Sequence, residues 1–187
     1  YARLNEPMSM HTTFRIGGPA DAYLEARHAA DLEKLFAFAR ERGVPVLLLG
    51  WGSNLLVRDG GIRGVVLRLR GEFEKVEFPK RSQLLGDDSE ALAAEGRLAA
   101  AGAGARIPAL VTACAERGLA GTEPLVGVPG TVGGALVMNA GTREGEIGAL
   151  VRGVRVFDPG ALAESWVPRG DLDFAYRASS LEGRVVL

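Results

Sequence analysis

Apolar and polar positions follow a helical period in two segments of the chain. The first predicted helix begins at the N-cap Asp31 and stops at Gly43; the second carries Pro108 in its first turn and stops at Gly118. Their apolar faces consist of Leu32, Leu35, Phe36 and Ala39 in the first helix and of Ile107, Leu110, Val111 and Cys114 in the second.

Short apolar runs between turn sequences predict strands. Residues 45–49 are continuously apolar, which is typical of a buried strand beside a helix. Turns are expected at residues 59–61, 102–105 and 158–160. The other predicted strands are residues 21–26, 55–57, 64–69, 98–101, 151–157, 164–168 and 184–187.

The segment 70–95 is charged and irregular, with one alternating stretch at 73–78, and is predicted as a hairpin or a junction. It divides the chain into two halves that each contain a helix, strands and a glycine loop. The predicted fold class is therefore α+β with two subdomains, residues 1–70 and 71–187. We expect a cleft between them, lined by the glycine loops, because ligands commonly bind between domains.

Composition excludes several classes of function. The 187 residues carry 22 basic and 23 acidic side chains, and this balance does not suggest a basic surface for nucleic acid or a membrane. No signal peptide and no apolar run of about 20 residues is present. The single cysteine, Cys114, is expected in the core and fits a reducing compartment, so we expect a cytoplasmic protein. His11 and His28 lack neighbours at metal-ligand spacing, and no metal site is predicted.

Glycine is enriched, with 26 residues, roughly twice the usual share. Residues 127–141, G-V-P-G-T-V-G-G-A-L-V-M-N-A-G, contain five glycines among apolar side chains. Buried glycine-rich backbone leaves N–H groups that need partners, and a bound phosphate is one such partner. Tight turns between strands are the other interpretation of this segment.

Two further segments carry polar groups suited to an anionic ligand. Residues 49–56, L-G-W-G-S-N-L-L, follow a predicted strand, and Ser53 and Asn54 can bond phosphate oxygens. The segment matches neither the P-loop nor the dinucleotide-binding fingerprint, and a simple turn remains possible. In residues 174–179, F-A-Y-R-A-S, Arg177 offers a guanidinium for a carboxylate or phosphate and Tyr176 a hydroxyl and a ring.

These segments, together with T-T-F-R-I-G-G-P-A at residues 12–20 and the block 118–141, resemble in order the signature blocks of the UDP-N-acetylenolpyruvoylglucosamine reductases. The resemblance implies the two-subdomain FAD-binding fold of the vanillyl-alcohol-oxidase (PCMH) type, with FAD in the cleft. It implies reduction of UDP-N-acetylglucosamine enolpyruvate to UDP-N-acetylmuramate in peptidoglycan synthesis, with FAD as cofactor and NADPH as co-substrate. The UDP-sugar and NADPH are then the expected small-molecule partners.

The resemblance also implies roles for individual residues. Arg177 matches the family's catalytic arginine, and Tyr176 is expected to position substrate. The matching cofactor-binding residues are Gly50, Gly52, Ser53, Asn54 and Leu55 in one loop and Pro129, Gly130, Thr131, Gly133, Gly134 and Asn139 in the other.

The chain departs from the family pattern in three places. Trp51 stands where glycine is frequent, and Thr142-Arg143-Glu144 stands where Ala-Tyr-Gly is common, which replaces an aromatic group by a cation. The family's third domain, with its proton-donating serine in a G-S-x-F block and its late glutamate, has no counterpart in these residues. Another flavin oxidoreductase of the same fold, or a flavin-binding fragment without turnover, are the alternative predictions.

Overall fold

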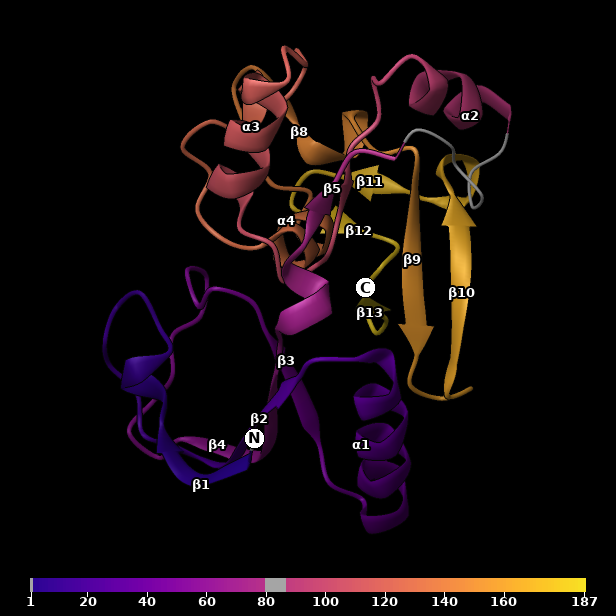
Figure 1. The fold of residues 1–187 in the computed structure, drawn as a ribbon. Coiled ribbons are helices and arrows are strands. Elements are labelled where there is room, and N and C mark those ends of the chain that lie inside the picture. The colour runs from indigo at the N-terminus through magenta and orange to yellow at the C-terminus, as the bar shows by residue number, and fades with distance from the viewer. Residues whose placement is uncertain (1, 80–86) are drawn as a thin grey trace.

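The computed structural model describes residues 2–79 and 87–187 (Figure 1). The first half forms a four-stranded sheet in the order β1-β2-β4-β3, in which β1 is antiparallel to β2 and the other neighbours are parallel. The strands are β1 (Ala2–Pro7), β2 (Pro19–Ala26), β3 (Val46–Leu49) and β4 (Ile62–Leu69), with the short 3-10 helix η1 (Met8–Met10) between the first two.

Helix α1 (Ala29–Arg42) connects β2 to β3, and Gly43 ends it in the left-handed conformation, at φ 62°, as predicted. The predicted N-cap is wrong. His28 is the N-cap, and Asp31 lies at the third helical position, where its carboxylate accepts hydrogen bonds from the N–H groups of Arg27 (2.8 Å) and His28 (3.0 Å). Asp31 therefore satisfies backbone donors from inside the helix, as the acidic partner of a capping box does.

Two strand predictions in this half need correction. Strand β3 exists, but its apolar run is not fully buried, because β3 is an edge strand and Leu47 and Leu48 are 37% and 40% exposed. Residues 55–57 form no strand; they belong to the irregular connection between β3 and β4, although Val57 is buried. Strands β2 and β4 confirm the predictions for 21–26 and 64–69.

The segment 70–95 forms the 3-10 helix η2 (Gly71–Glu74), strand β5 (Val76–Glu77) and helix α2 (Asp87–Ala94). Strand β5 pairs antiparallel with β6 (Ala100–Ala101), which replaces the longer strand predicted at 98–101. Residues 80–86, which the hairpin-or-junction prediction also covers, lie outside the described residues.

The second half contains α3 (Ile107–Glu116), with Pro108 in its first turn as predicted, and the antiparallel sheet β10-β9-β13. It also contains a helix that the sequence did not reveal, α4 (Val132–Val137), inside the glycine-rich segment. The remaining elements are η3 (Glu123–Leu125), β7 (Gly141–Thr142), β8 (Gly145–Glu146), η4 (Ile147–Ala149), β9 (Gly153–Asp158), β10 (Ala163–Pro168), η5 (Arg169–Asp171), β11 (Phe174–Ala175), β12 (Ala178–Ser179) and β13 (Val185–Val186).

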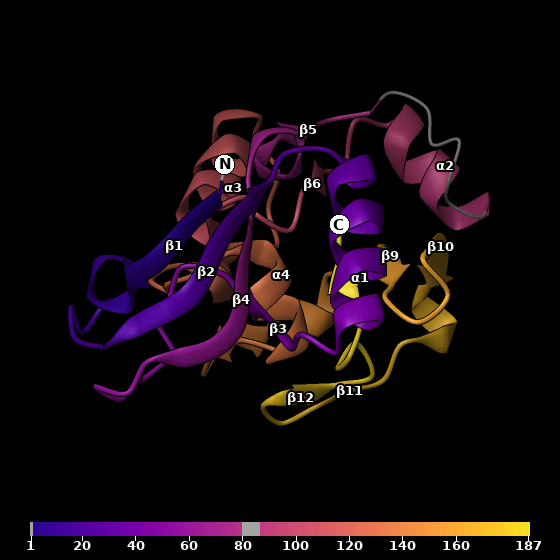
Figure 2. The same ribbon diagram turned by 90° about the horizontal axis from the view of Figure 1, so that it is seen from below.

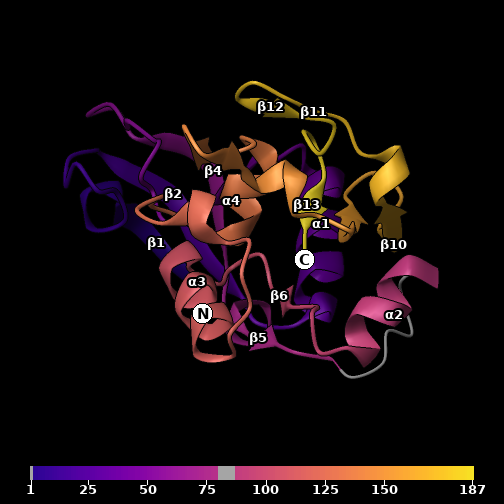
Figure 3. The same cartoon turned by 90° about the horizontal axis from the view of Figure 1, so that it is seen from above.

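One large apolar cluster joins both halves of the chain. It packs Phe36 of α1 against Phe157 of β9, with ring centroids 5.7 Å apart, and Arg40 also donates a hydrogen bond to the carbonyl of Gly160 (3.0 Å). Cys114 lies in this cluster at 2% exposure, which confirms its predicted core position, and burial raises the pKa of its thiol. In the views from below and above, β1 and α2 lie on opposite sides of the molecule (Figures 2 and 3). The subdomain boundary near Arg70 stays a prediction.

Candidate functional site

The first glycine loop, residues 50–55, follows β3 and is held by the segment at 11–13. Thr13 donates to the carbonyl of Gly52 twice, from its N–H (3.1 Å) and from its hydroxyl (2.8 Å). Gly52 has φ 72°, and a Cβ at this position would lie 2.1 Å from the carbonyl oxygen of His11. Only glycine fits this close approach, so Gly52 and Thr13 together fix the path of the loop.

The second glycine loop, residues 129–134, leads into α4. Thr131 is the N-cap of α4, and its hydroxyl accepts from the N–H of Gly134 at 3.4 Å. The loop is held by the predicted turn at 102–105, because Gly133 donates to the carbonyl of Ala103 (2.8 Å) and a Cβ at Gly133 would lie 2.8 Å from the Ala103 side chain. The Gly133 N–H is thus already used inside the protein.

The structure brings the two glycine loops into contact. A Cβ placed on Gly50 would lie 2.7 Å from the hydroxyl oxygen of Thr131, and one placed on Gly130 would lie 3.5 Å from that of Ser53. Across the described residues, the N–H groups of residues 51–55 and of Gly130 and Thr131 donate to no protein acceptor. We call these unpaired N–H groups on two adjacent loops the cradle, because such groups suit phosphate oxygens.

Asn139 lies just beyond the C-terminal end of α4, in the left-handed conformation at φ 43°, and is 2% exposed. Its side-chain amide donates to Glu146 (2.6 Å) and to the carbonyl of Ala175 (3.0 Å), and its carbonyl oxygen accepts from the N–H of Gly148 (3.1 Å). Both ends of the amide are therefore engaged with the protein. Asn139 ties together the β7–β8 and β11–β12 hairpins, and its predicted FAD contact stays a prediction.

Tyr176 and Arg177 form the two-residue turn between β11 and β12, where Arg177 has φ 57°. Tyr176 is 82% exposed, and the Arg177 guanidinium carbon lies 5.5 Å from the centre of its ring. The two residues line a hollow of about 420 Å³, here called the hairpin pocket, whose walls are Gly141, Thr142, Arg143, Glu146, Tyr176 and Arg177. In the described part of the chain, neither Arg143 nor Arg177 has a carboxylate partner, so the pocket offers two guanidinium groups to an anionic ligand.

The cradle and the hairpin pocket lie at opposite ends of α4. A helix of six residues is about 9 Å long. Ser179 adds a second link between these elements, because its hydroxyl donates to the carbonyl of Val137 at 3.0 Å. In the described part of the chain, no hydrogen bond, ion pair or ring contact joins Arg177 to either glycine loop.

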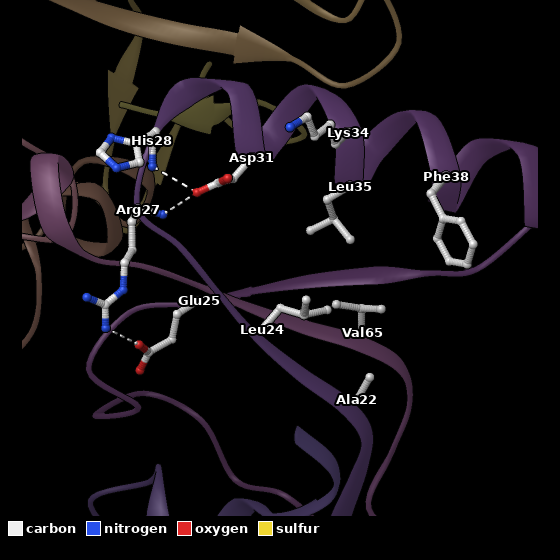
Figure 4. Close-up of a pocket in the computed structure, with 10 residues that line it drawn as sticks. All are labelled: Ala22, Leu24, Glu25, Arg27, His28, Asp31, Lys34, Leu35, Phe38 and Val65. Atoms are coloured by element: carbon white, nitrogen blue, oxygen red, sulfur yellow. Dashed lines mark hydrogen bonds and ion pairs between the residues drawn. The ribbon is translucent and has the colours of Figure 1, made fainter. Parts of the chain in front are cut away.

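A second hollow, of about 600 Å³, lies between α1 and the face of β2 and β4 (Figure 4). Leu24, Leu35 and Val65 give it an apolar wall, and Arg27 forms an ion pair with Glu25 (3.3 Å) at its edge. None of the predicted site residues lines it. The cradle and the hairpin pocket are therefore the candidate site.

The described ranges contain no group of three His, Cys, Asp or Glu side chains that could hold a metal ion. Nor does any helix in residues 2–79 and 87–187 combine the length and apolar character needed to cross a membrane. The cradle, the pocket and the α+β architecture suit a protein that binds a phosphate-bearing organic cofactor. Glycines suit such a group because, without side chains, they let it come close to the backbone N–H groups.

The family can be stated more closely. A family model described as an FAD binding domain matches residues 20–162, and the chain belongs to this family. It is 44% identical over 177 residues to UDP-N-acetylenolpyruvoylglucosamine reductase of Moorella thermoacetica, covering 95% of this chain and 53% of that protein. It is 40% identical over 189 residues to UDP-N-acetylenolpyruvoylglucosamine reductase of Rubrobacter xylanophilus, covering 100% of this chain and 58% of that protein. The chain thus spans about half the length of the curated relatives it matches.

Solved structures give the same result. The crystal structure of UDP-N-acetylenolpyruvylglucosamine reductase (MurB) from Thermus caldophilus superposes with a TM-score of 0.74 at 36% identity, covering all of this chain and 59% of that one. Two more distant structures share the fold. A Physcomitrella patens BBE-like 1 variant has a TM-score of 0.58 at 20% identity, covering 89% of this chain and 36% of that one. A solvent-stable cholesterol oxidase has a TM-score of 0.57 at 19% identity, covering 86% of this chain and 31% of that one. The predicted α+β FAD-binding fold of the vanillyl-alcohol-oxidase type is confirmed.

Proposed function

We propose that the protein is the FAD-binding part of a UDP-N-acetylenolpyruvoylglucosamine reductase that acts in the cytoplasm. Such an enzyme reduces the enolpyruvyl group of UDP-N-acetylglucosamine enolpyruvate and gives UDP-N-acetylmuramate for peptidoglycan synthesis. The observation that carries this proposal is the hairpin pocket, which presents Arg177 at one end of α4 with the phosphate cradle at the other. The similarity to the reductases of Moorella thermoacetica and Rubrobacter xylanophilus supports the choice of substrate. The family resemblance alone supports NADPH as the electron donor.

The unpaired N–H groups of the two glycine loops suit the diphosphate of FAD. Ser53, Asn54 and Thr131 add hydroxyl and amide groups, whereas Leu55 and Pro129 shape the loops around them. When bound, FAD supplies the hydride-transfer chemistry that no protein side chain offers. The residues of this chain hold that group and orient the substrate toward it.

Arg177 is placed to stabilise charge in the reaction. Addition of hydride to the enolpyruvyl double bond develops negative charge on the adjoining carboxylate, as an enolate. A fixed guanidinium at that carboxylate binds the transition state more tightly than the substrate. Tyr176, beside Arg177, would position the substrate.

The test uses the complete polypeptide, purified with FAD, and follows NADPH oxidation with and without the UDP-enolpyruvyl substrate. Substitution Arg177→Ala should leave the flavin absorbance intact and lower kcat by roughly 10²–10³-fold, because one transition-state donor is lost. Arg177→Lys should recover part of that rate. Unchanged turnover in Arg177→Ala would reject the role of Arg177, and NADPH oxidation that ignores the UDP-sugar would reject the substrate.

A further inference from the structure

Two arginines from other elements lie over the indole of Trp51, a residue of the first glycine loop. The guanidinium carbon of Arg106 lies 3.9 Å from the centre of the ring, and that of Arg68 lies 5.3 Å from it. We call these three residues the Trp51 stack. The distance to Arg106 is that of a close cation–π contact.

The Trp51 stack touches the phosphate cradle through the backbone. Trp51 belongs to the first glycine loop, and Arg106 forms an isolated β-bridge with Thr131 of the second. Arg68 pairs in the sheet with Leu49, the residue before the first loop. Each cation is therefore anchored within one or two residues of backbone that lines the cradle.

The positive charge of the Trp51 stack is uncompensated. In the described part of the chain, neither Arg68 nor Arg106 forms an ion pair with a carboxylate, although Arg68 also interacts with the Tyr23 hydroxyl. Two like charges over one ring repel each other, and an anion bound nearby would relieve that repulsion. The unpaired N–H groups of the cradle also favour an anionic ligand.

We propose that the Trp51 stack is a further anion-binding element of the FAD site: Trp51 holds Arg106, and with it Arg68, at the cradle, where the guanidinium groups bind the FAD diphosphate. The proposal rests on the placement of FAD at the glycine loops. It assigns a binding role to Arg106, and it makes Trp51 a positioning residue that acts through the two arginines. Stacking on the indole reduces the freedom that the Arg106 side chain loses when it binds phosphate.

The test measures FAD affinity of the flavin-free complete polypeptide by isothermal titration calorimetry. Arg106→Ala should weaken binding roughly tenfold or more, the loss expected when a charged hydrogen-bond partner is removed. Trp51→Gly should also weaken binding, because Arg106 loses the ring on which it stacks. Arg106→Lys should bind with intermediate affinity, because it keeps the charge and loses the planar stack. The matched control is Arg117→Ala, which removes a similar contact, with Phe78 at 4.1 Å, at the other end of α3.

A second readout separates anion binding from a structural role. Salt screens charge–charge attraction, so FAD affinity of the unchanged protein should fall more steeply than that of Arg106→Ala between about 0.05 M and about 0.5 M NaCl. Equal salt slopes, an affinity unchanged within about twofold, or an equal loss in Arg117→Ala would each overturn the proposal. If Gly130→Ala weakens FAD binding and Arg106→Ala does not, only the role of the Trp51 stack is wrong. If neither does, FAD does not lie at these loops.

Discussion

Asn139 shows how much of the site depends on a single buried side chain. Its three hydrogen bonds reach Glu146, Gly148 and Ala175, and so connect both hairpins that line the hairpin pocket. The sequence placed Asn139 at the end of a glycine-rich block, and the resemblance assigned it to the cofactor. Its bonds within the protein were not foreseeable, because Gly148 and Ala175 lie 9 and 36 residues away and no periodic pattern links them to Asn139.

We expect Asn139→Ala to lower the free energy of unfolding by about 2–4 kcal/mol, because the buried N–H of Gly148 loses its acceptor and Ala175 loses its donor. Asn139→Asp should be at least as harmful, since its carboxylate would face that of Glu146. Urea unfolding of the flavin-free protein measures both changes. Ser165→Ala, at an exposed position of β10, should shift the stability by less than about 0.5 kcal/mol. A loss in Asn139→Ala no larger than in this control would contradict the assignment.

At the scale of elements, local signals predicted α1 and α3 well and the strands less well. The 3.6-residue period, Pro108 and Gly43 are all local, and the structure confirms them. The burial of β3 depends instead on its neighbours: as an edge strand it leaves Leu47 and Leu48 exposed, which the run of apolar residues cannot show. Helix α4 was missed because Gly133 and Gly134 are poor helix formers, and its N-cap Thr131 and its packing on Ala103 outweigh that preference.

The start of α1 gives an element-scale prediction with a pH dependence. The N–H groups of Arg27 and His28 hold the pKa of Asp31 below its usual value, because they bond the ionised carboxylate. A lowered folded-state pKa means that the stabilisation is present above the unfolded value of about 3.9 and is lost as the pH falls through the folded value.

Asp31→Ala should therefore cost about 1 kcal/mol of stability at neutral pH, and this difference from the unchanged protein should shrink as the pH falls below about 3.9. Urea unfolding at a series of pH values measures it. Glu33→Ala, on an exposed position of the same helix, is the control and should show little difference at any pH. A difference for Asp31→Ala that stays constant with pH would contradict the role of the ionised carboxylate.

At the scale of the whole molecule, the cradle is built from both halves of the chain. Gly50 and Ser53 come from the half with the first sheet, whereas Gly130 and Thr131 come from the half with α3 and α4, and the sequence predicted both loops without showing that they touch. A ligand held by both loops stabilises the folded protein as a unit. At a free concentration of FAD 100 times the Kd, this stabilisation amounts to about 2.7 kcal/mol.

Gly130→Ala tests this coupling, because Gly130 has φ 125°, where an L side chain is strained, although the space near Ser53 would admit a methyl group. The backbone should shift and turn the N–H groups of Gly130 and Thr131 away from the phosphate. If FAD binds ten times more weakly, the stabilisation at the same FAD concentration falls from about 2.7 to about 1.4 kcal/mol. Thermal unfolding with and without FAD measures both increments. Gly170→Ala, where no atom lies within 4 Å of the added carbon, should keep the full increment; the full increment in Gly130→Ala would show that FAD does not depend on this loop.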